Sequence, residues 1–118
     1  MLDTARRFTS YLERKSLPCT AVEARQFDNG SVAIALIDHA PSPGNQYPPV
    51  DDLIVSIVVR SNHGIVERDV GAGQQIFREG PDCILVTPPR TASYWSFTGS
   101  PQVIHIAISA TCVDEFID

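Results

Sequence analysis

The chain has 118 residues, 43% of them hydrophobic, and a formal net charge of −5 at pH 7. This length suits one domain with one packed core. No apolar run approaches the roughly 20 residues that a membrane-spanning helix needs, and the N-terminus lacks the apolar stretch of a signal peptide. A net negative chain repels the phosphates of nucleic acid, so we expect no DNA binding by this chain alone.

The three cysteines, Cys19, Cys83 and Cys112, lie far apart and form no Cys-x-x-Cys pair. An odd number at such spacing argues against a disulfide framework and against a zinc knuckle. Reduced thiols, together with the lack of a signal peptide, predict a cytoplasmic protein.

The first predicted element is a helix over about residues 3–15, where Phe8 and Leu12 lie four positions apart. It ends before Leu17-Pro18, because the residue before a proline is restricted. We interpret its basic side chains as the solvated face of this helix rather than as a DNA-binding patch; they are Arg6, Arg7, Arg14 and Lys15.

From residue 21 onward the hydrophobic period changes to two, which predicts strands. Asp28-Asn29-Gly30 predicts a type I′ hairpin, because Asn-Gly accepts positive φ, and Asn62-His63-Gly64 suits a second hairpin. Residues 40–52, rich in proline and glycine, are predicted to form a loop. Short strands separated by such turns predict a β-sandwich or barrel. The predicted strands cover about residues 21–28, 31–38, 53–61, 65–70, 74–79, 83–87, 92–98 and 102–109.

The segment Leu53–Arg60 is apolar on both faces, so we expect cover on both sides, from the barrel core and from a helix or partner chain. Ile54 and Val58 are the residues expected to need that cover, which favours a homodimer. In the next strand the pattern leaves open whether Glu67 or Arg68 faces inward.

A helix is predicted to begin at Thr111, because Thr111-Cys112-Val113-Asp114 fits a capping box and Glu115 adds negative charge to the first turn. It covers residues 111–118. Two interpretations stay open: a short terminal helix docked on the barrel, or the start of a helix that continues into a further domain of a longer protein.

Side chains capable of catalysis or metal binding are few and scattered. His39, His63 and His105 lie outside metal-ligand spacing of one another. No nucleophile motif and no complete glycine motif for nucleotides occurs. We therefore expect no metal, no cofactor and no catalytic activity.

A pocket is predicted instead around the aromatic group near Trp95. If Gly99-Ser100 forms a two-residue hairpin, the two last strands pair directly, and cross-strand partners share a face. The mostly apolar face is expected to point inward and bind the ligand, whereas His105 and Tyr94 fall on the outer face. The predicted ligand-binding residues are Ser93, Trp95, Phe97, Ile104 and Ile106.

The stretch from about residue 53 to 109 resembles the N-terminal cupin-like domain of AraC-type transcriptional regulators. The resemblance lies in Gly80-Pro81-Asp82-Cys83-Ile84-Leu85-Val86-Thr87-Pro88-Pro89, in Ser93-Tyr94-Trp95 and in Val103-Ile104-His105-Ile106-Ala107-Ile108. It implies a mostly β jelly-roll barrel (a double-stranded β-helix) that spans residues 1–118 as one domain with a short helix at each end. Metal cupins carry a His-x-His pair and a second-motif histidine; here the pair is absent and Ser93 stands near that histidine's position.

The resemblance further implies a function as a sensing domain. Such a domain binds a small organic effector in a metal-free barrel, forms a homodimer, and contacts DNA only through a C-terminal helix-turn-helix domain that this chain does not contain. Two alternatives stay open: a stand-alone small cupin enzyme of the isomerase or lyase type, and a purely structural dimerisation module.

Overall fold

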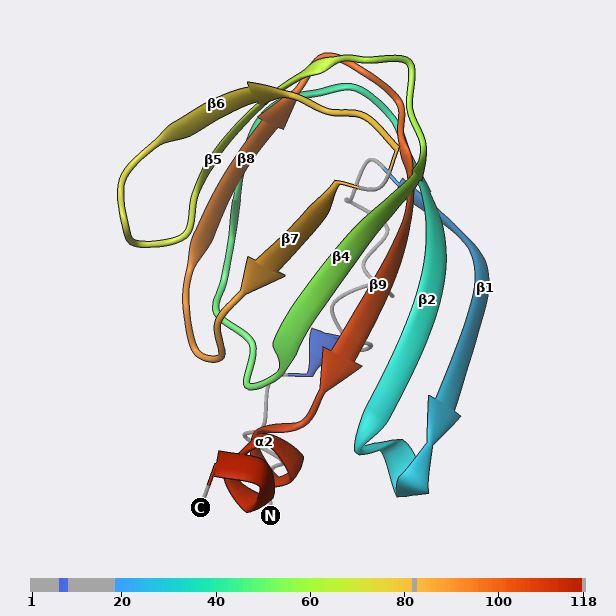
Figure 1. Cartoon of the computed structure of the whole chain (residues 1–118), viewed down its shortest axis with the longest axis vertical. Coiled ribbons are helices and arrows are strands. Elements are labelled where there is room, and N and C mark those ends of the chain that lie inside the picture. The colour runs from blue at the N-terminus through green and yellow to red at the C-terminus, as the bar shows by residue number, and fades with distance from the viewer. Residues whose placement is uncertain (1–6, 9–18, 82, 118) are drawn as a thin grey trace.

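The computed structural model describes residues 7–8, 19–81 and 83–117, which form two antiparallel sheets facing each other (Figure 1). Sheet A has the strand order β1-β2-β9-β4-β7 and sheet B has the order β3-β8-β5-β6. The predicted jelly-roll barrel is therefore confirmed. The predicted helix over residues 3–15 lies outside the described residues except for Arg7 and Phe8. The strands are β1 (Cys19–Phe27), β2 (Val32–His39), β3 (Ser42–Tyr47), β4 (Leu53–Arg60), β5 (Ile65–Asp69), β6 (Gln75–Arg78), β7 (Ile84–Thr87), β8 (Ser93–Phe97) and β9 (Gln102–Ile108).

The predicted loop over residues 40–52 contains a strand that the sequence pattern missed. β3 pairs with β8 along one edge of sheet B, with Tyr47 opposite Ser93 and a register shift between Ser42 and Asn45. Proline is tolerated at a sheet edge, where one side of the strand needs no ladder hydrogen bonds. The prolines and the glycine of this segment therefore mark an edge strand rather than the end of the sheet.

The inner face of sheet A combines small and polar side chains with isoleucine and valine. β9 lies between β2 and β4, so that His105 is opposite Ala35 on one side and Ser56 on the other. Partners across a ladder share a face, and alternate residues of all three strands are buried. The buried residues of this inner face are Ala33, Ala35, Ile37, Ile54, Ser56, Val58, Val103 and Ala107.

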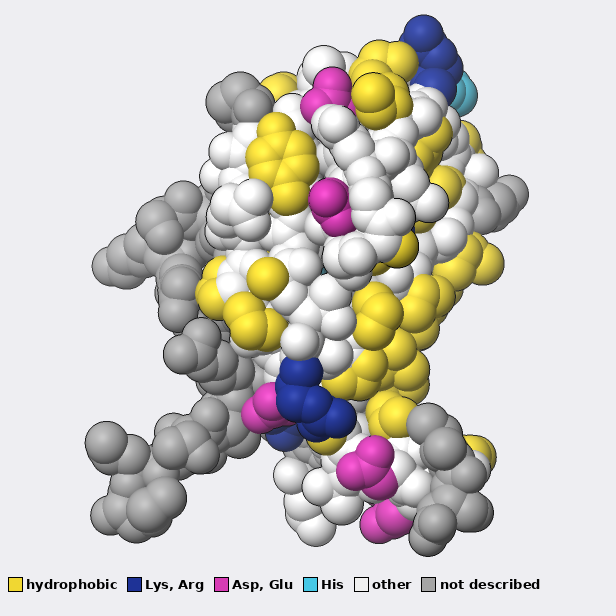
Figure 2. Space-filling model, turned by 90° about the vertical axis from the view of Figure 1, so that its left-hand side faces the viewer, with side chains coloured by type: hydrophobic (Ala, Val, Ile, Leu, Met, Phe, Trp, Pro, Cys, Tyr) yellow, Lys and Arg dark blue, Asp and Glu magenta, His cyan; other side chains and the backbone are white. Residues whose placement is uncertain are grey.

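The outer face of sheet A carries large aliphatic side chains. Figure 2 shows hydrophobic side chains gathered along one flank of the molecule, and several members of this face are strongly exposed, including Ile84 at 61% and Val86 at 47%. The side chains on this face are cross-strand partners that follow one another from β2 through β9 and β4 to β7. We call these residues the aliphatic face: Ile34, Leu36, Val55, Ile57, Ile84, Val86, Ile104 and Ile106.

This arrangement corrects the predicted need for cover on β4. Ile54 and Val58 are 5% and 3% exposed and point into the barrel, so the core already covers them. The uncovered side of β4 carries Val55 and Ile57 instead. β4 is apolar on both faces, as predicted, but the residues predicted to need cover, Ile54 and Val58, are those that the core already covers.

The predicted hairpin at Gly99-Ser100 is wrong, because β8 and β9 belong to different sheets. The chain crosses from sheet B to sheet A at this point, and Asn62-His63-Gly64 is likewise a crossing from β4 to β5 rather than a hairpin. The two crossings touch: a Cβ on Gly64 would lie 2.3 Å from the backbone nitrogen of Gly99. Both glycines are required by this close approach of two backbones.

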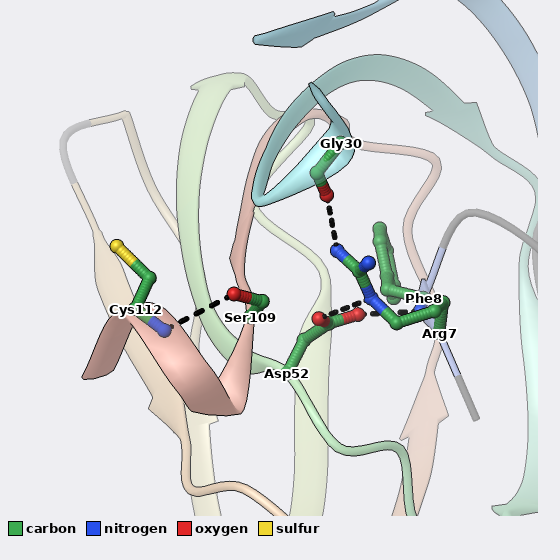
Figure 3. A network of polar contacts seen from close by, with 6 residues as sticks. All are labelled: Arg7, Phe8, Gly30, Asp52, Ser109 and Cys112. Carbon is green, nitrogen blue, oxygen red and sulfur yellow. Dashed lines mark hydrogen bonds and ion pairs between the residues drawn. The ribbon is translucent and has the colours of Figure 1, made fainter. Parts of the chain in front are cut away.

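The C-terminal helix α2 runs from Ala110 to Ile117, one residue earlier than predicted. Its cap is Ser109, whose hydroxyl accepts a hydrogen bond from the Cys112 backbone N–H at 3.2 Å (Figure 3). The predicted cap at Thr111 is therefore wrong, since Ser109, directly after β9, already satisfies the first turn. No helix in the described part of the chain is long and apolar enough to cross a membrane.

Candidate functional site

A cavity of about 140 Å³ lies between the two sheets and is lined mainly by apolar side chains from both of them. Apolar pockets with a few placed polar groups are the usual form of small-molecule sites. The polar groups on its wall come from both sheets and from the connections between strands; they are His39, Tyr47, Ser56, Glu79, Thr87, Thr91, Ser93 and His105.

Three of the five predicted ligand-binding residues line this cavity. Ser93, Trp95 and Phe97 alternate along β8 and all point inward, as predicted, whereas Tyr94 and Ser96 point outward. That Ser93, Trp95 and Phe97 contact a ligand stays a prediction.

Ile104 and Ile106 do not line the cavity; they belong to the aliphatic face, on the other side of sheet A. The predicted pairing of β8 with β9 placed them inside, and the separation of these strands into two sheets reverses the face. The same error placed His105 outside, whereas its side chain lies on the cavity wall.

A chain of three hydrogen-bonded side chains crosses the inner face of sheet A. Ser56 Oγ lies 2.8 Å from His105 Nδ1, and His105 Nε2 lies 2.9 Å from His39 Nε2. Two imidazoles joined in this way need at least one neutral ring, because a hydrogen bond needs an acceptor as well as a donor. Burial lowers the pKa of His39 to about 4, against the opposing effect of Asp38. Burial, and then the nearby His39, lower the pKa of His105 to about 3.

Both imidazoles are therefore neutral at pH 7. A general base works best when its pKa lies near the operating pH. Although Ser56 and His105 are within hydrogen-bond distance, an imidazole with a pKa of about 3 is a poor base for activating a hydroxyl. The chain of Ser56, His105 and His39 suits the recognition of a polar group better than the abstraction of a proton.

Two residues near the N-terminus, Arg7 and Phe8, are held against the barrel by polar contacts (Figure 3). Asp52 is fully buried and accepts hydrogen bonds from Arg7 Nε at 2.7 Å and from the Phe8 backbone N–H at 2.6 Å. Arg7 Nη2 also donates to the Gly30 carbonyl oxygen at 2.6 Å. These contacts hold Phe8 on the cavity wall, with its ring centroid 5.4 Å from that of His105. Arg7 is thus an anchor for the segment, a role that its position among basic residues did not indicate.

A buried carboxylate lies on the cavity wall after β6. Glu79 is 4% exposed, and its Oε1 accepts a hydrogen bond from the Ser61 hydroxyl at 3.2 Å. Burial raises the pKa of the Glu79 carboxyl, while the Ser61 hydrogen bond and the nearby His63 act in the opposite sense.

The donor set of this barrel does not fit a metal ion. Among the described residues, no group of three or more His, Cys, Asp or Glu side chains is placed to hold one. His39 and His105 are hydrogen-bonded to each other, and Ser93 on the same cavity wall offers only a hydroxyl. Structural and catalytic metal sites use several nitrogen, sulfur or carboxylate ligands that converge on one point.

No protein-family model matches the chain, and no curated protein sequence matches it. Solved structures do match in fold. The cupin domain of Schizosaccharomyces pombe Cnp3 superposes with a TM-score of 0.63 at 12% identity, covering 89% of this chain and 70% of that one. This chain has the cupin fold. The Clostridium difficile EutQ protein matches with a TM-score of 0.59 at 9% identity, covering 89% of this chain and 76% of that one.

A third cupin match has nearly the same length as this chain. It is a Rhizobium leguminosarum protein of unknown function, with a TM-score of 0.58 at 14% identity, covering 92% of this chain and 97% of that one. At these identities the likeness establishes the cupin barrel and leaves the chemistry to the residues of this chain.

Several residues that line the cavity were not predicted from the sequence. A lone histidine in a strand gives no signal, and the pairing of His39 with His105 across 66 positions depends on β2 and β9 being neighbours. Ser56 offered a weak signal, since it is the one hydroxyl in the aliphatic run Leu53–Val59. A polar side chain on a buried strand usually has a partner.

Proposed function

We propose that this chain binds a small, largely apolar molecule inside its barrel and serves as the metal-free sensing domain of an AraC-type transcriptional regulator. The observation that carries the proposal is the cavity itself. Protein interiors are normally packed without voids larger than a water molecule. A cavity of about 140 Å³ with a mostly apolar wall therefore represents lost packing that a ligand can recover.

The size of the cavity suits a single ring or a short branched chain. Apolar cavities of about 150 Å³ stay dry and accept benzene. The aromatic side chains Trp95, Phe97 and Phe8 line the wall, and Ser93 and Ser56 supply hydroxyl groups. These features support the binding of one small organic molecule with limited polarity.

The proposal includes no catalytic step. The two imidazoles on the wall are poor bases at neutral pH, because burial lowers their pKa values to about 4 and about 3. Turnover of a carbonyl compound by the purified protein would favour the alternative of a stand-alone isomerase or lyase.

The cavity is tested by ligand-observed fluorine NMR with fluorobenzene as the probe. We expect broadening of the fluorine signal with the unmodified chain and its loss with Ser93→Leu, which places a larger side chain in the cavity. Ser96→Leu is the matched control, because Ser96 lies on the same strand but points outward. Equal broadening by all three proteins would locate the probe outside the barrel and contradict the proposal.

We also propose that a second copy of the chain covers the aliphatic face. Soluble monomers rarely expose a large contiguous apolar patch, and such patches usually mark interfaces. The identical aliphatic faces of two copies can pair in the self-complementary way that a two-fold dimer needs.

Sedimentation velocity tests this interface. Ile104→Lys, in the middle of the aliphatic face, is expected to weaken self-association by about 100-fold or more. The control is Ile76→Lys, at a side chain that is 64% exposed on sheet B. A chain that sediments as a monomer at high concentration without any substitution would contradict the dimer.

The regulatory part of the proposal is tested by reading the gene sequence downstream of the codon for Asp118. We expect the reading frame to continue past Asp118 for roughly one further domain with two helix-turn-helix patterns. A stop codon at that point would leave a stand-alone binding module.

A further inference from the structure

Arg68 is the cation inside this barrel, and the structure settles that it, rather than Glu67, points inward. Its side chain is 5% exposed, and it lies directly across the ladder from Trp95. The guanidinium carbon lies 4.9 Å from the centroid of the Trp95 ring. Nη2 donates a hydrogen bond of 2.8 Å to the Val86 carbonyl oxygen on β7, so that Arg68 spans from sheet B to sheet A.

The charge of Arg68 has no anionic partner in the described part of the chain. The ion pairs there are Arg7–Asp52 and Arg25–Glu23. The Nε of Arg68 is buried, and its N–H has no hydrogen-bond acceptor among residues 7–8, 19–81 and 83–117. Burial lowers the pKa of the Arg68 guanidinium, and the nearby Cys83 thiol acts in the opposite sense. A buried charge is costly unless it is paired and fully hydrogen-bonded, and a carbonyl oxygen and a ring face meet this need only in part.

Arg68 does not itself line the cavity, but it contacts or neighbours residues that do. Its stacking partner Trp95 lines the cavity, and so does Val66, two residues earlier on the same face of β5. Its acceptor Val86 lies between Leu85 and Thr87, whose side chains also line the cavity. An anion in the cavity would therefore contact Trp95, the residue over whose ring the Arg68 guanidinium lies.

We propose that Arg68 is the anion-recognition residue of the barrel and that the natural ligand is a small carboxylate with an apolar body, such as an aromatic acid. The carboxylate accepts a hydrogen bond from the free Nε–H and neutralises the guanidinium, while the apolar body contacts Trp95 and Phe97. This inference rests on the proposed function, since it names the chemical class of the molecule that the cavity takes. Arginine suits the role because its planar guanidinium matches a carboxylate.

The test compares two probes of nearly the same shape, 4-fluorobenzoate and 4-fluorobenzamide, at pH 7. Fluorine NMR reports binding, and Trp95, the single tryptophan of the chain, reports it independently by its fluorescence. We expect the carboxylate to bind at least about tenfold more tightly than the amide, as for a charge-assisted hydrogen bond. The preference is expected to disappear in Arg68→Met, which keeps the length of the side chain and removes the charge. Arg60→Met, at an exposed arginine on β4, is the control and is expected to keep it.

A second measurement needs no substitution. The Nε–H proton of Arg68 gives its own NMR signal, which we expect to shift downfield on addition of 4-fluorobenzoate and to stay in place with 4-fluorobenzamide. Equal binding of the two probes, or a preference that survives in Arg68→Met, would overturn the role of Arg68 while fluorobenzene binding still supported the cavity. Failure of all three probes to bind would overturn the proposed function together with this inference.

Discussion

The inner face of sheet A combines alanines and polar side chains with Ile37 and Ile54, whereas the aliphatic face carries only aliphatic side chains. Ala35 and Ala107 lie inside and are 3% and 0% exposed, whereas Ile104 and Ile106 lie on the aliphatic face. The cavity lies against the inner face, where Ser56 and His105 are on its wall, and the aliphatic face lies on the opposite side of the sheet. We propose that the inner face serves ligand binding and the aliphatic face serves association.

The difference between the two faces is tested most directly by placing a charge on each face of the same strand. Val58 and Ile57 are neighbours on β4, and Val58 is 3% exposed on the inner face. We expect Val58→Lys to lower the free energy of unfolding by about 4 kcal/mol or more, because it buries an unpaired charge. Ile57→Lys is expected to cost less than about 1 kcal/mol in the monomer and to act on self-association instead. Urea unfolding at low protein concentration measures the free energy of unfolding of both variants. Similar losses of stability would show that the two faces of β4 are equally covered.

A change of pH tests the inner face in particular, because the two buried histidines of sheet A, His39 and His105, lie on that face. The pKa values of His39 and His105 in the folded state, about 4 and about 3, lie below the ordinary value of 6.5. The unfolded chain therefore binds more protons below pH 6.5, and stability falls as the pH falls from 6.5 towards 4. For His39 alone the expected loss is about 3 kcal/mol, from about 1.36 kcal/mol for each pKa unit.

Urea unfolding at pH 7 and pH 4 tests this loss. His39→Asn is expected to remove a large part of the difference between the two pH values. His63→Asn, at an exposed histidine, is the control against which the curve is compared. An unaltered loss of stability in His39→Asn would mean that the acid sensitivity arises elsewhere in the molecule.

The smallest expected effect comes from substitutions that change the size or shape of an apolar side chain and add no charge. Ala107→Leu inserts three carbons at a fully buried inner position and is expected to cost about 1–3 kcal/mol by overpacking. Ile106→Leu, one residue earlier on the aliphatic face, keeps the volume and is expected to cost less than about 1 kcal/mol. Thermal unfolding of the two variants gives the comparison. A stabilised Ala107→Leu would mean that the cavity extends to this end of sheet A.

Local sequence patterns predicted the positions of most strands of this fold. Which face of a strand points inward depends on long-range strand pairing, which these patterns do not show. Alternation of apolar residues located eight of the nine described strands, but β3 was missed because Pro43 and Gly44 suggest a loop. The faces of β8 were predicted, since Trp95 and Phe97 are large and alternate with polar residues. The faces of β9 were inverted, because a turn at Gly99-Ser100 looks the same in sequence whether the chain forms a hairpin or crosses to another sheet.

The candidate site was predictable only in its aromatic half. His39, Ser56 and His105 meet because three strands distant in sequence are neighbours in sheet A. Arg68 stands out only because it is buried without an ion-pair partner among the described residues. No local pattern carries such information. Buried polar residues are recognised by what surrounds them, which a single sequence does not display.

The turn between β1 and β2 joins the cavity to the point where the chain leaves the barrel. Arg7, which anchors Phe8 on the cavity wall, donates to the Gly30 carbonyl, and the next residue, Ser31, accepts a hydrogen bond of 2.8 Å from the backbone of Ser109, the cap of α2. Hydrogen bonds on two successive residues of this turn therefore connect the arginine that positions Phe8 at the cavity with the residue that caps α2.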